Sequence, residues 1–272
     1  MWNRGFEGWY FKHQVKDYML AFIPGRSQSG SFIQMITSTG SRQFDVQQLT
    51  VKKDNIYADN CVFTPSGVEI DLPGVQGRID YYNLVPLHSD IMGPFSHLPM
   101  QCRHGVVSMS HSLKGSIEID GVDRCFDMGL GYIEKDSGRS FPRSYLWMQC
   151  NDFSEPCAVM VSIAHIPFCM FSFKGCLCAI VYQGKEYRLA TYYGVRILEA
   201  RADHIKLLQG KLLLEINICP SELNHTLRSP VKGRMSGNIR ESCNALARVR
   251  LWDGDKLIFD LSSEHAVYEA ML

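Results

Sequence analysis

The sequence predicts an all-β protein made of antiparallel sheets, most simply closed into barrels. Runs rich in Val, Ile, Tyr, Phe and Thr recur along the 272 residues and are divided by Gly, Asp, Asn and Pro. Helical periodicity is scarce between these runs, so neighbouring strands are expected to pair directly with one another. Barrels leave no unpaired strand edge, which favours them over open sheets.

The expected strands follow one another at short intervals. In the first part of the chain they are residues 8–13, 18–24, 30–39, 44–51, 56–63, 67–72 and 77–85. In the second part they are residues 116–127, 186–194, 204–218, 245–252 and 256–263. The turn pairs are Asp120-Gly121, Asp253-Gly254 and, more weakly, Gln183-Gly184-Lys185. The exception is the C-terminus, where residues 262–272 could form a short helix with Ser263 as its cap.

A segment that lacks the alternation of apolar and polar residues typical of strands divides the chain. Residues 85–105 contain three Pro and three His, and we expect them to form a covering loop or a linker. The sequence thus predicts two β-domains, residues 1–105 and residues 106–272. The three histidines, His88, His97 and His104, could gather in space, but each taken singly is more often a surface or capping residue.

The charge balance excludes one class of partner. Lys plus Arg equals Asp plus Glu, at 28 each, so no basic field of the whole chain attracts nucleic acid. Charged residues make up 21% and aromatic residues 11%, which argues against disorder. No run approaches the ~18 apolar residues of a membrane span, and the first residues lack the apolar core of a secretory signal. We therefore expect a cytoplasmic protein.

The cysteines do not have the spacing of a metal site. Ten are scattered without a CxxC pair, and Cys169, Cys176 and Cys178 come closest to a cluster, among apolar residues. Free Cys is among the most buried residue types, so we expect buried, reduced thiols and no metal. The sequence also lacks GxSxG, P-loop, HExxH and GxGxxG motifs, and no cofactor is expected.

One expected strand joins large rings to amides. In SYLWMQCN, residues 144–151, alternation places on one face Tyr145, Trp147, Gln149 and Asn151. The residues between them are typical of a core. Apolar walls with a few directed polar groups line ligand pockets. The alternative is a solvent-exposed face with aromatic pairs, which is unusual for Trp and Tyr together.

A pair of carboxylates precedes that strand. In YIEKD an extended backbone puts Glu134 and Asp136 on one side and Lys135 on the other. Two carboxylates that share a low-dielectric face raise each other's proton affinity, so one of them would serve as a general acid. The alternative is an exposed loop in which Lys135, Arg139 and Arg143 neutralise both.

A second polar and aromatic cluster lies near the start of the chain. In FEGWYFK, Glu7 and Trp9 share one face of the expected strand, and Tyr10 lies on the other. Gly8 permits close approach of a backbone or a ligand. A carboxylate in such a strand is costly to bury without a partner, and a cation from residues 135–143 is a candidate.

These segments carry a resemblance to a known family. The chain resembles the tocopherol cyclases in FEGWYFK, GYIEKDSGRSFPRSYLWMQCN, GKEYRLATYYG and the closing GNIRESCNALARVRLWDGDKLIFDLSSEHAVYE, which together run over nearly its whole length. The specific part is E-K-D-x-G-x-S-F-P followed by a strand with aromatic-Trp-x-Gln-x-Asn. The opening E-x-W-Y is similar, more distantly, to hydroxyneurosporene hydratase and Diels-Alderase-like proteins. The resemblance implies two lipocalin-like β-barrels, with a ligand pocket between or within them.

The resemblance also implies an activity. Tocopherol cyclases close a chromanol ring by adding a phenolic hydroxyl across a trisubstituted alkene of a prenylated quinol, without redox change or cofactor. Such a step needs a proton donor aimed at the alkene and aromatic faces beside the tertiary cation. It also needs a dry pocket that keeps water from the cation. The family string usually has Trp where this chain has Ser137, so one aromatic wall is expected to be missing. The chain is shorter than the plant enzymes and has no plastid transit segment, as expected of a bacterial relative.

The resemblance assigns provisional roles to the residues of these segments. Asp136 or Glu134 is the general acid, and Lys135 or Arg139 anchors the site by pairing with Glu7. The pocket walls are Tyr145, Trp147, Trp9 and Tyr10, and the groups that orient the quinol oxygens are Gln149 and Asn151.

Two functions stay open at this point. One is a cofactor-free cyclase, or another enzyme that adds a group to an alkene under acid catalysis, acting on a hydrophobic quinol or isoprenoid. The other is a lipocalin-like carrier that binds a lipophilic small molecule without turnover. A cyclase for such a hydrophobic molecule is expected to meet a membrane at least transiently, and the oligomeric state is left open.

Overall fold

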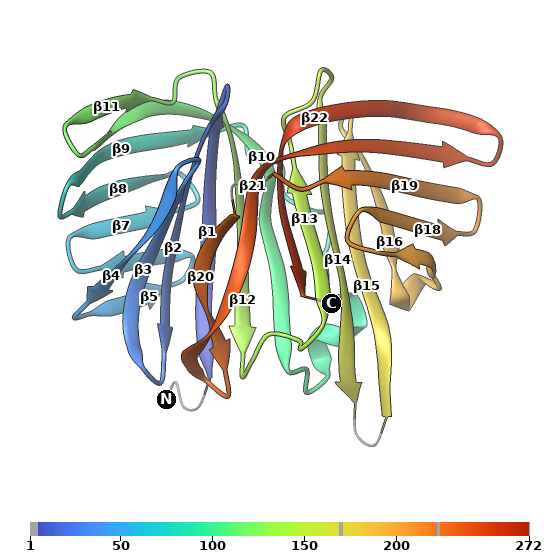
Figure 1. Cartoon of the computed structure of the whole chain (residues 1–272), viewed down its shortest axis with the longest axis horizontal. Coiled ribbons are helices and arrows are strands. Elements are labelled where there is room, and N and C mark those ends of the chain that lie inside the picture. Colours follow the sequence, from blue (N-terminus) through green and yellow to red (C-terminus); the bar gives the residue numbers. More distant parts are fainter. Residues whose placement is uncertain (1–4, 169–170, 222–223, 272) are drawn as a thin grey trace. The chain divides into compact units, whose positions relative to one another are not determined.

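The computed structural model describes residues 5–168, 171–221 and 224–271. The all-β prediction is confirmed, because the strands of the described residues form two large antiparallel sheets (Figure 1). Helical structure in the same residues is limited to the 3-10 turns η1 (Gly93–His97) and η2 (Thr191–Tyr193). Neither is nearly long enough to cross a bilayer, and the described part of the chain has no other candidate helix for a membrane span.

The first sheet has 12 strands in the order β4-β3-β2-β1-β12-β10-β9-β8-β7-β6-β5, with β11 paired to β10. Its bounds are β1 (Phe6–Val15), β2 (Tyr18–Ser27), β3 (Gly30–Thr37), β4 (Gly40–Val46), β5 (Leu49–Lys52), β6 (Asn55–Ala58), β7 (Cys61–Thr64), β8 (Gly67–Leu72), β9 (Val75–Tyr82), β10 (Cys102–Ile119), β11 (Val122–Cys125) and β12 (Leu130–Gly138). Most neighbours are consecutive hairpins, but β1 pairs with β12 across more than a hundred residues. That pairing brings the N-terminal cluster beside the carboxylate pair.

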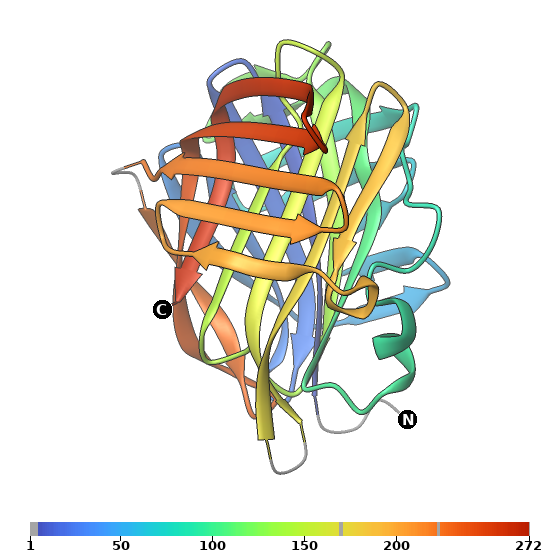
Figure 2. The same cartoon turned by 90° about the vertical axis from the view of Figure 1, so that its right-hand side faces the viewer.

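The second sheet has 10 strands in the order β16-β15-β14-β13-β22-β21-β19-β18-β17, with β20 paired to β21 (Figure 2). Its bounds are β13 (Tyr145–Cys150), β14 (Cys157–Phe168), β15 (Phe171–Tyr182), β16 (Lys185–Ala190), β17 (Arg196–Ala200), β18 (His204–Gln209), β19 (Leu212–Cys219), β20 (Asn224–Val231), β21 (Arg234–Asp253) and β22 (Lys256–Met271). The long strand β22 pairs with both β13 and β21.

Each sheet encloses its own hydrophobic core because its strands alternate. In β8, GVEIDL, Val68, Ile70 and Leu72 are buried while Glu69 and Asp71 are exposed. The core of the first sheet gathers such residues with Trp9, Phe11 and others. The core of the second sheet includes the inward residues of β13, namely Leu146, Met148 and Cys150.

The chain forms two compact units that do not divide at residue 105. Unit 1 consists of residues 1–86, 104–140 and 228–237, and unit 2 consists of residues 87–103, 141–227 and 238–272. The single boundary expected from the sequence therefore differs from the division in the structure. The reason is topological, because β10 and β12 complete the first sheet although they follow the linker in the sequence.

Part of the segment 85–105, which was expected to form a covering loop or a linker, makes hydrogen bonds within unit 2. The Arg188 guanidinium donates to the carbonyl oxygens of Asp90 and Ser89, at 3.1 and 3.2 Å. The Tyr192 hydroxyl donates to the carbonyl oxygen of Ile91 at 2.9 Å. Residues 89–91 are thus held against β16 and η2 by side chains that donate to their backbone carbonyl groups, and residues 87–103 belong to unit 2.

The short C-terminal helix expected over residues 262–272 is not formed, and this prediction was wrong. Residues up to Met271 continue β22, and Tyr145↔Met271 and Gln149↔Val267 are register pairs with β13. Ser263, the expected cap, is a strand residue that pairs with Ala247 of β21. Pairing with two neighbouring strands overrides the weak helical preference of this segment.

Candidate functional site

Strand β12 separates the sequence-predicted site residues onto two faces. Glu134 pairs with Tyr10 of β1, and Asp136 pairs with Gly8. Directly opposite residues of antiparallel strands share a face, so these four lie together, away from the unit 1 core. Lys135, which pairs with Trp9, lies on the core side. The alternation expected for YIEKD is therefore present.

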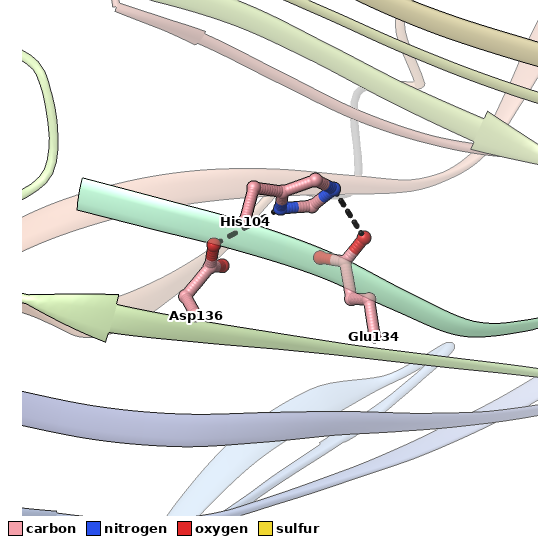
Figure 3. A group of neighbouring side chains, drawn as sticks. All are labelled: His104, Glu134 and Asp136. Carbon is pink, nitrogen blue, oxygen red and sulfur yellow. Dashed lines mark hydrogen bonds and ion pairs between the residues drawn. The ribbon is translucent and has the colours of Figure 1, made fainter. Parts of the chain in front are cut away.

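His104 lies between the two carboxylates. It comes from β10, the strand next to β12, and its imidazole has one carboxylate at each ring nitrogen (Figure 3). Nδ1 lies 3.0 Å from Oδ1 of Asp136, and Nε2 lies 3.5 Å from Oε2 of Glu134. An ionised carboxylate only accepts hydrogen bonds, whereas neutral imidazole has one donor and one acceptor nitrogen. The geometry therefore allows the imidazole to pass a proton between the two carboxyl groups.

Tyr132 extends this chain of polar groups into the interior. Its hydroxyl donates to Oε2 of Glu134 at 2.5 Å, and its side chain is completely buried. Burial, and then the negative charge of Glu134, raise the pKa of the Tyr132 phenol well above its usual value. The phenol therefore stays protonated at neutral pH and acts on Glu134 as a hydrogen-bond donor.

Exposure decreases along the chain of groups. The side chain of Asp136 is 23% exposed, that of His104 12% and that of Glu134 7%. The cross-strand neighbours explain the difference, because Tyr10 covers Glu134 whereas Gly8 leaves room beside Asp136. A Cβ at Gly8 would have only Ile23 within 4 Å. Asp136 is thus the solvent-side member of the trio and Glu134 the interior one.

The same three residues are also the possible metal ligands of the described residues. His104, Glu134 and Asp136 each offer one ligand atom, and these atoms lie within 4.8 Å of one another. His and carboxylate ligands suit several divalent metals. The carboxylates, however, contact opposite nitrogens of one ring, an arrangement that suits proton sharing more closely than joint ligation of one ion. Among the thiols, Cys176 and Cys178 are free and buried, and Cys169 lies outside the described residues.

Glu7 and the residues around it form a separate group on the core side of β1. Glu7 makes a 2.7 Å ion pair with Arg26 of β2, in place of the pairing with Lys135 or Arg139 that the sequence suggested. Arg139 is exposed, and its carbonyl oxygen accepts a hydrogen bond from Gly233. Trp9 is 6% exposed and belongs to the unit 1 core.

The aromatic and amide residues of the SYLWMQCN strand belong to unit 2. All four are buried, and the two rings are each 7% exposed: Tyr145, Trp147, Gln149 and Asn151. This excludes the solvent-exposed alternative. The Tyr145 hydroxyl donates to Oε2 of Glu269 on β22 at 2.6 Å. Whether these side chains contact a substrate stays a prediction.

Two residues of the site, and the partner of Glu7 in the separate group, were not found from the sequence. His104 was weighed only as one of three dispersed histidines, and Tyr132 and Arg26 were not singled out. The position of Tyr132, two residues before Glu134, is the one signal that the sequence offered, because an alternating strand puts both on one face.

Comparison with protein families gives a match over most of the chain. The family described as tocopherol cyclase-like matches residues 84–270. A rice relative, "Probable tocopherol cyclase, chloroplastic" from Oryza sativa subsp. japonica, is 29% identical over 182 residues, which are 61% of this chain and 39% of the relative. "Tocopherol cyclase, chloroplastic" from Zea mays is 26% identical over 61% of this chain and 38% of that protein. The chain thus spans well under half the length of these curated relatives.

Solved structures share the fold at low sequence identity. CghA, crystallised with Sch210972, has a TM-score of 0.66 and 9% identity, covering 99% of this chain and 89% of that one. Kievitone hydratase from Nectria haematococca has a TM-score of 0.51 and 10% identity, covering 98% and 88% of the two chains. At identities this low, the structural similarity shows a common fold alone.

Proposed function

Because the matched region covers more than half of its residues, the chain belongs to the tocopherol cyclase-like family, and we propose that it is a cyclase acting on a hydrophobic prenylated quinol. The reaction is the addition of a phenolic hydroxyl across an alkene under acid catalysis. The observation that carries this proposal is His104, held between Glu134 and Asp136 on a largely buried face.

The proposed reaction is an isomerisation in which every atom of the substrate is retained. A carboxylic acid gives its proton to the less substituted alkene carbon, and the alkene π electrons form the new C–H bond. The phenolic oxygen then bonds to the tertiary carbon that carries the positive charge. The phenolic proton passes to the carboxylate, which restores the acid for the next turnover.

We assign the donor role to Glu134. It is the less exposed of the two carboxyl groups, and burial favours an acid that keeps its proton until the alkene accepts it. Once Glu134 is ionised, the Tyr132 hydroxyl stabilises the carboxylate by donating to Oε2. His104 and Asp136 then relay a proton to Glu134 from the solvent side.

Tyr10 supplies the aromatic face in this scheme. It lies directly opposite Glu134 on β1 and is 8% exposed. A ring face close to a developing cation stabilises it through the ring quadrupole. Because the cation forms on the carbon next to the one that Glu134 protonates, a ring neighbouring the acid is in a suitable position.

The test separates turnover from binding. Glu134→Gln and Asp136→Asn keep the size of each side chain and remove its acidic proton. With a prenylated hydroquinone as substrate, we expect each variant to lower chromanol formation by ~10²-fold or more, while affinity for the hydroquinone stays nearly unchanged. Asp123→Asn, on the exposed strand β11, is the matched control and should retain full activity. Product formation that is unaltered in both variants would refute the acid assignment.

A further inference from the structure

A second candidate site lies on the opposite face of the β1–β12 strand pair. A pocket in unit 1 has walls from Trp9, Phe11, Ile133 and Val107, and a polar rim that includes Glu7 and Lys135. Its enclosed space is about 60 Å³, and the remainder is open to solvent. Register explains the lining, because Trp9↔Lys135 and Phe11↔Ile133 are cross-strand pairs.

This pocket is distinct from the His104 trio. Glu134 and Asp136 alternate with Ile133 and Lys135 along β12, so the two sets of side chains leave opposite faces of one strand. A ligand in the pocket would therefore contact the sheet from the core side. The residues that line the pocket take no part in the acid chemistry proposed above.

The rim of the pocket has an excess of positive charge. Glu7 is neutralised by Arg26, which leaves Lys135, Lys53 and Asp54 at the rim. Neither lysine has an ion-pair partner within the part of the chain that the structure describes. The stem of Lys135 packs over Gly105, where an added Cβ would lie 3.3 Å from both Cγ and Cε. That packing directs the ammonium group while its methylene groups cover apolar surface.

From this combination we infer that unit 1 binds a small amphipathic anion, a carboxylate carried on an apolar chain or ring. The apolar part packs on Trp9 and Phe11, and the anionic head lies at the rim beside Lys135 and Lys53. The small enclosed space, far below the ~300–1,000 Å³ of pockets that hold a whole ligand, takes only the end of a short apolar chain, and the rest of the ligand lies along the rim.

The inference is tested with two probes of equal chain length, sodium octanoate and 1-octanol, titrated by calorimetry into the full chain. Octanoate is expected to bind more tightly than octanol, and its affinity should fall as NaCl is raised, because rim charges are screened. Lys135→Met removes the charge and keeps the length of the side chain. It should weaken octanoate binding about threefold to fivefold, as expected for an exposed ion pair, and leave octanol unaffected.

Two further variants control for indirect effects. Lys114→Met alters an exposed lysine that does not line the pocket, and octanoate binding should not change. Val107→Trp fills the pocket and should abolish binding of both probes. Glu134→Gln, on the opposite face, should leave octanoate affinity intact. Equal affinity for octanoate and octanol, no binding of either, or an unchanged affinity in Lys135→Met would each overturn the inference.

Discussion

Glu134 illustrates what a buried carboxyl group requires. Glu134 is 5% exposed, and burying a carboxyl group to this extent costs folding free energy unless other groups form hydrogen bonds with it. The Tyr132 hydroxyl donates a hydrogen bond to it, Nε2 of His104 lies 3.5 Å away, and Asp136 holds the other nitrogen of His104. The four side chains therefore depend on one another, and removing one alters the protonation and position of the rest.

This dependence predicts non-additive kinetics. His104→Ala should lower turnover about as much as Asp136→Asn does, because both interrupt the relay to Glu134. The double variant should lose little more than either single one, since the residues act as a unit. The rate of His104→Ala should also depend differently on pH, because the imidazole no longer exchanges protons with Glu134. If the turnover losses of the two single variants multiply in the double variant, and the pH profile of His104→Ala is unchanged, then His104 only supports the structure.

Part of this site could be predicted from single residues and part could not. The period of an extended strand was enough to place Glu134 and Asp136 together and Lys135 apart. His104 precedes Glu134 by thirty residues, and only the pairing of β10 with β12 brings it there. A lone His between strands carries no sequence signal for such a pairing.

At the scale of elements, β10 shows how glycine permits a close crossing. Gly115 has φ +130°, and a Cβ there would collide with the carbonyl oxygen of Arg78 on β9. It lies just before the point where β10 also begins to pair with β11, at Ser116. Only glycine adopts this backbone conformation at little cost.

We therefore expect Gly115→Ala to lower the free energy of unfolding by about 1–3 kcal/mol, through strain and the collision with β9. The measurement is urea denaturation at neutral pH. Gly40→Ala is the matched control on β4, where nothing lies within 4 Å of an added Cβ, and it should change stability by less than about 0.5 kcal/mol. Equal stabilities for both variants would show that β10 shifts to accommodate the methyl group.

The C-terminal strand shows where local preference fails. Residues 262–272 contain Glu, Ala, Met and Leu, which favour helices when isolated. In the protein, β22 fills the position between β13 and β21 and supplies hydrogen bonds to both. A single sequence does not reveal that a central position in a sheet is vacant. For the same reason, the sequence predicted which side chains of β13 share a face but did not predict that β22 pairs with this strand.

At the scale of the molecule, the core of unit 1 contains ionisable groups held neutral. Nδ1 of His13 donates to the Leu20 carbonyl oxygen at 3.1 Å, so Nε2 accepts from the Tyr81 hydroxyl at 2.5 Å. The His111 ring packs at a tilt against that of Tyr81, with ring centroids 4.4 Å apart. Burial lowers the pKa of His13 to about 4, and burial together with the nearby His13 lowers the pKa of His111 to about 3.

These values predict a loss of stability in mild acid. The unfolded chain binds protons at both histidines near pH 6.5, whereas the folded chain binds them only near pH 4 and pH 3. Unfolding is therefore favoured progressively as pH falls through this window, and the contribution is fully present above pH 6.5. Urea midpoints measured from pH 7.5 to pH 5 should fall steadily, before most carboxylates titrate.

A substitution isolates the histidine contribution. His111→Phe keeps a ring against Tyr81 and removes one titrating group, so its urea midpoint should depend less on pH over the same range. If the wild-type midpoint does not change between pH 7.5 and pH 5, then His13 and His111 are not held neutral in the folded protein.

The fold class could be predicted because its cause is local, whereas the division into units could not. Alternation in segments such as GVEIDL, together with Asp-Gly turns, is enough to indicate antiparallel sheets. The linker composition of residues 85–105 suggested one boundary. In the structure β10 and β12 return to the first sheet, and residues 228–237 also belong to unit 1. Such long-range pairings leave no mark on composition.

Isotope labelling tests most directly whether Glu134 donates the proton that the alkene carbon receives. The reaction of the prenylated hydroquinone is run in D₂O, and the chromanol is analysed by mass spectrometry and NMR. Because the carboxyl proton of Glu134 exchanges with solvent through His104 and Asp136, we predict one deuterium per product, on the carbon next to the new C–O bond. In Glu134→Gln the labelled product should be nearly lost. Chromanol formed without deuterium at that carbon would contradict proton donation from this site.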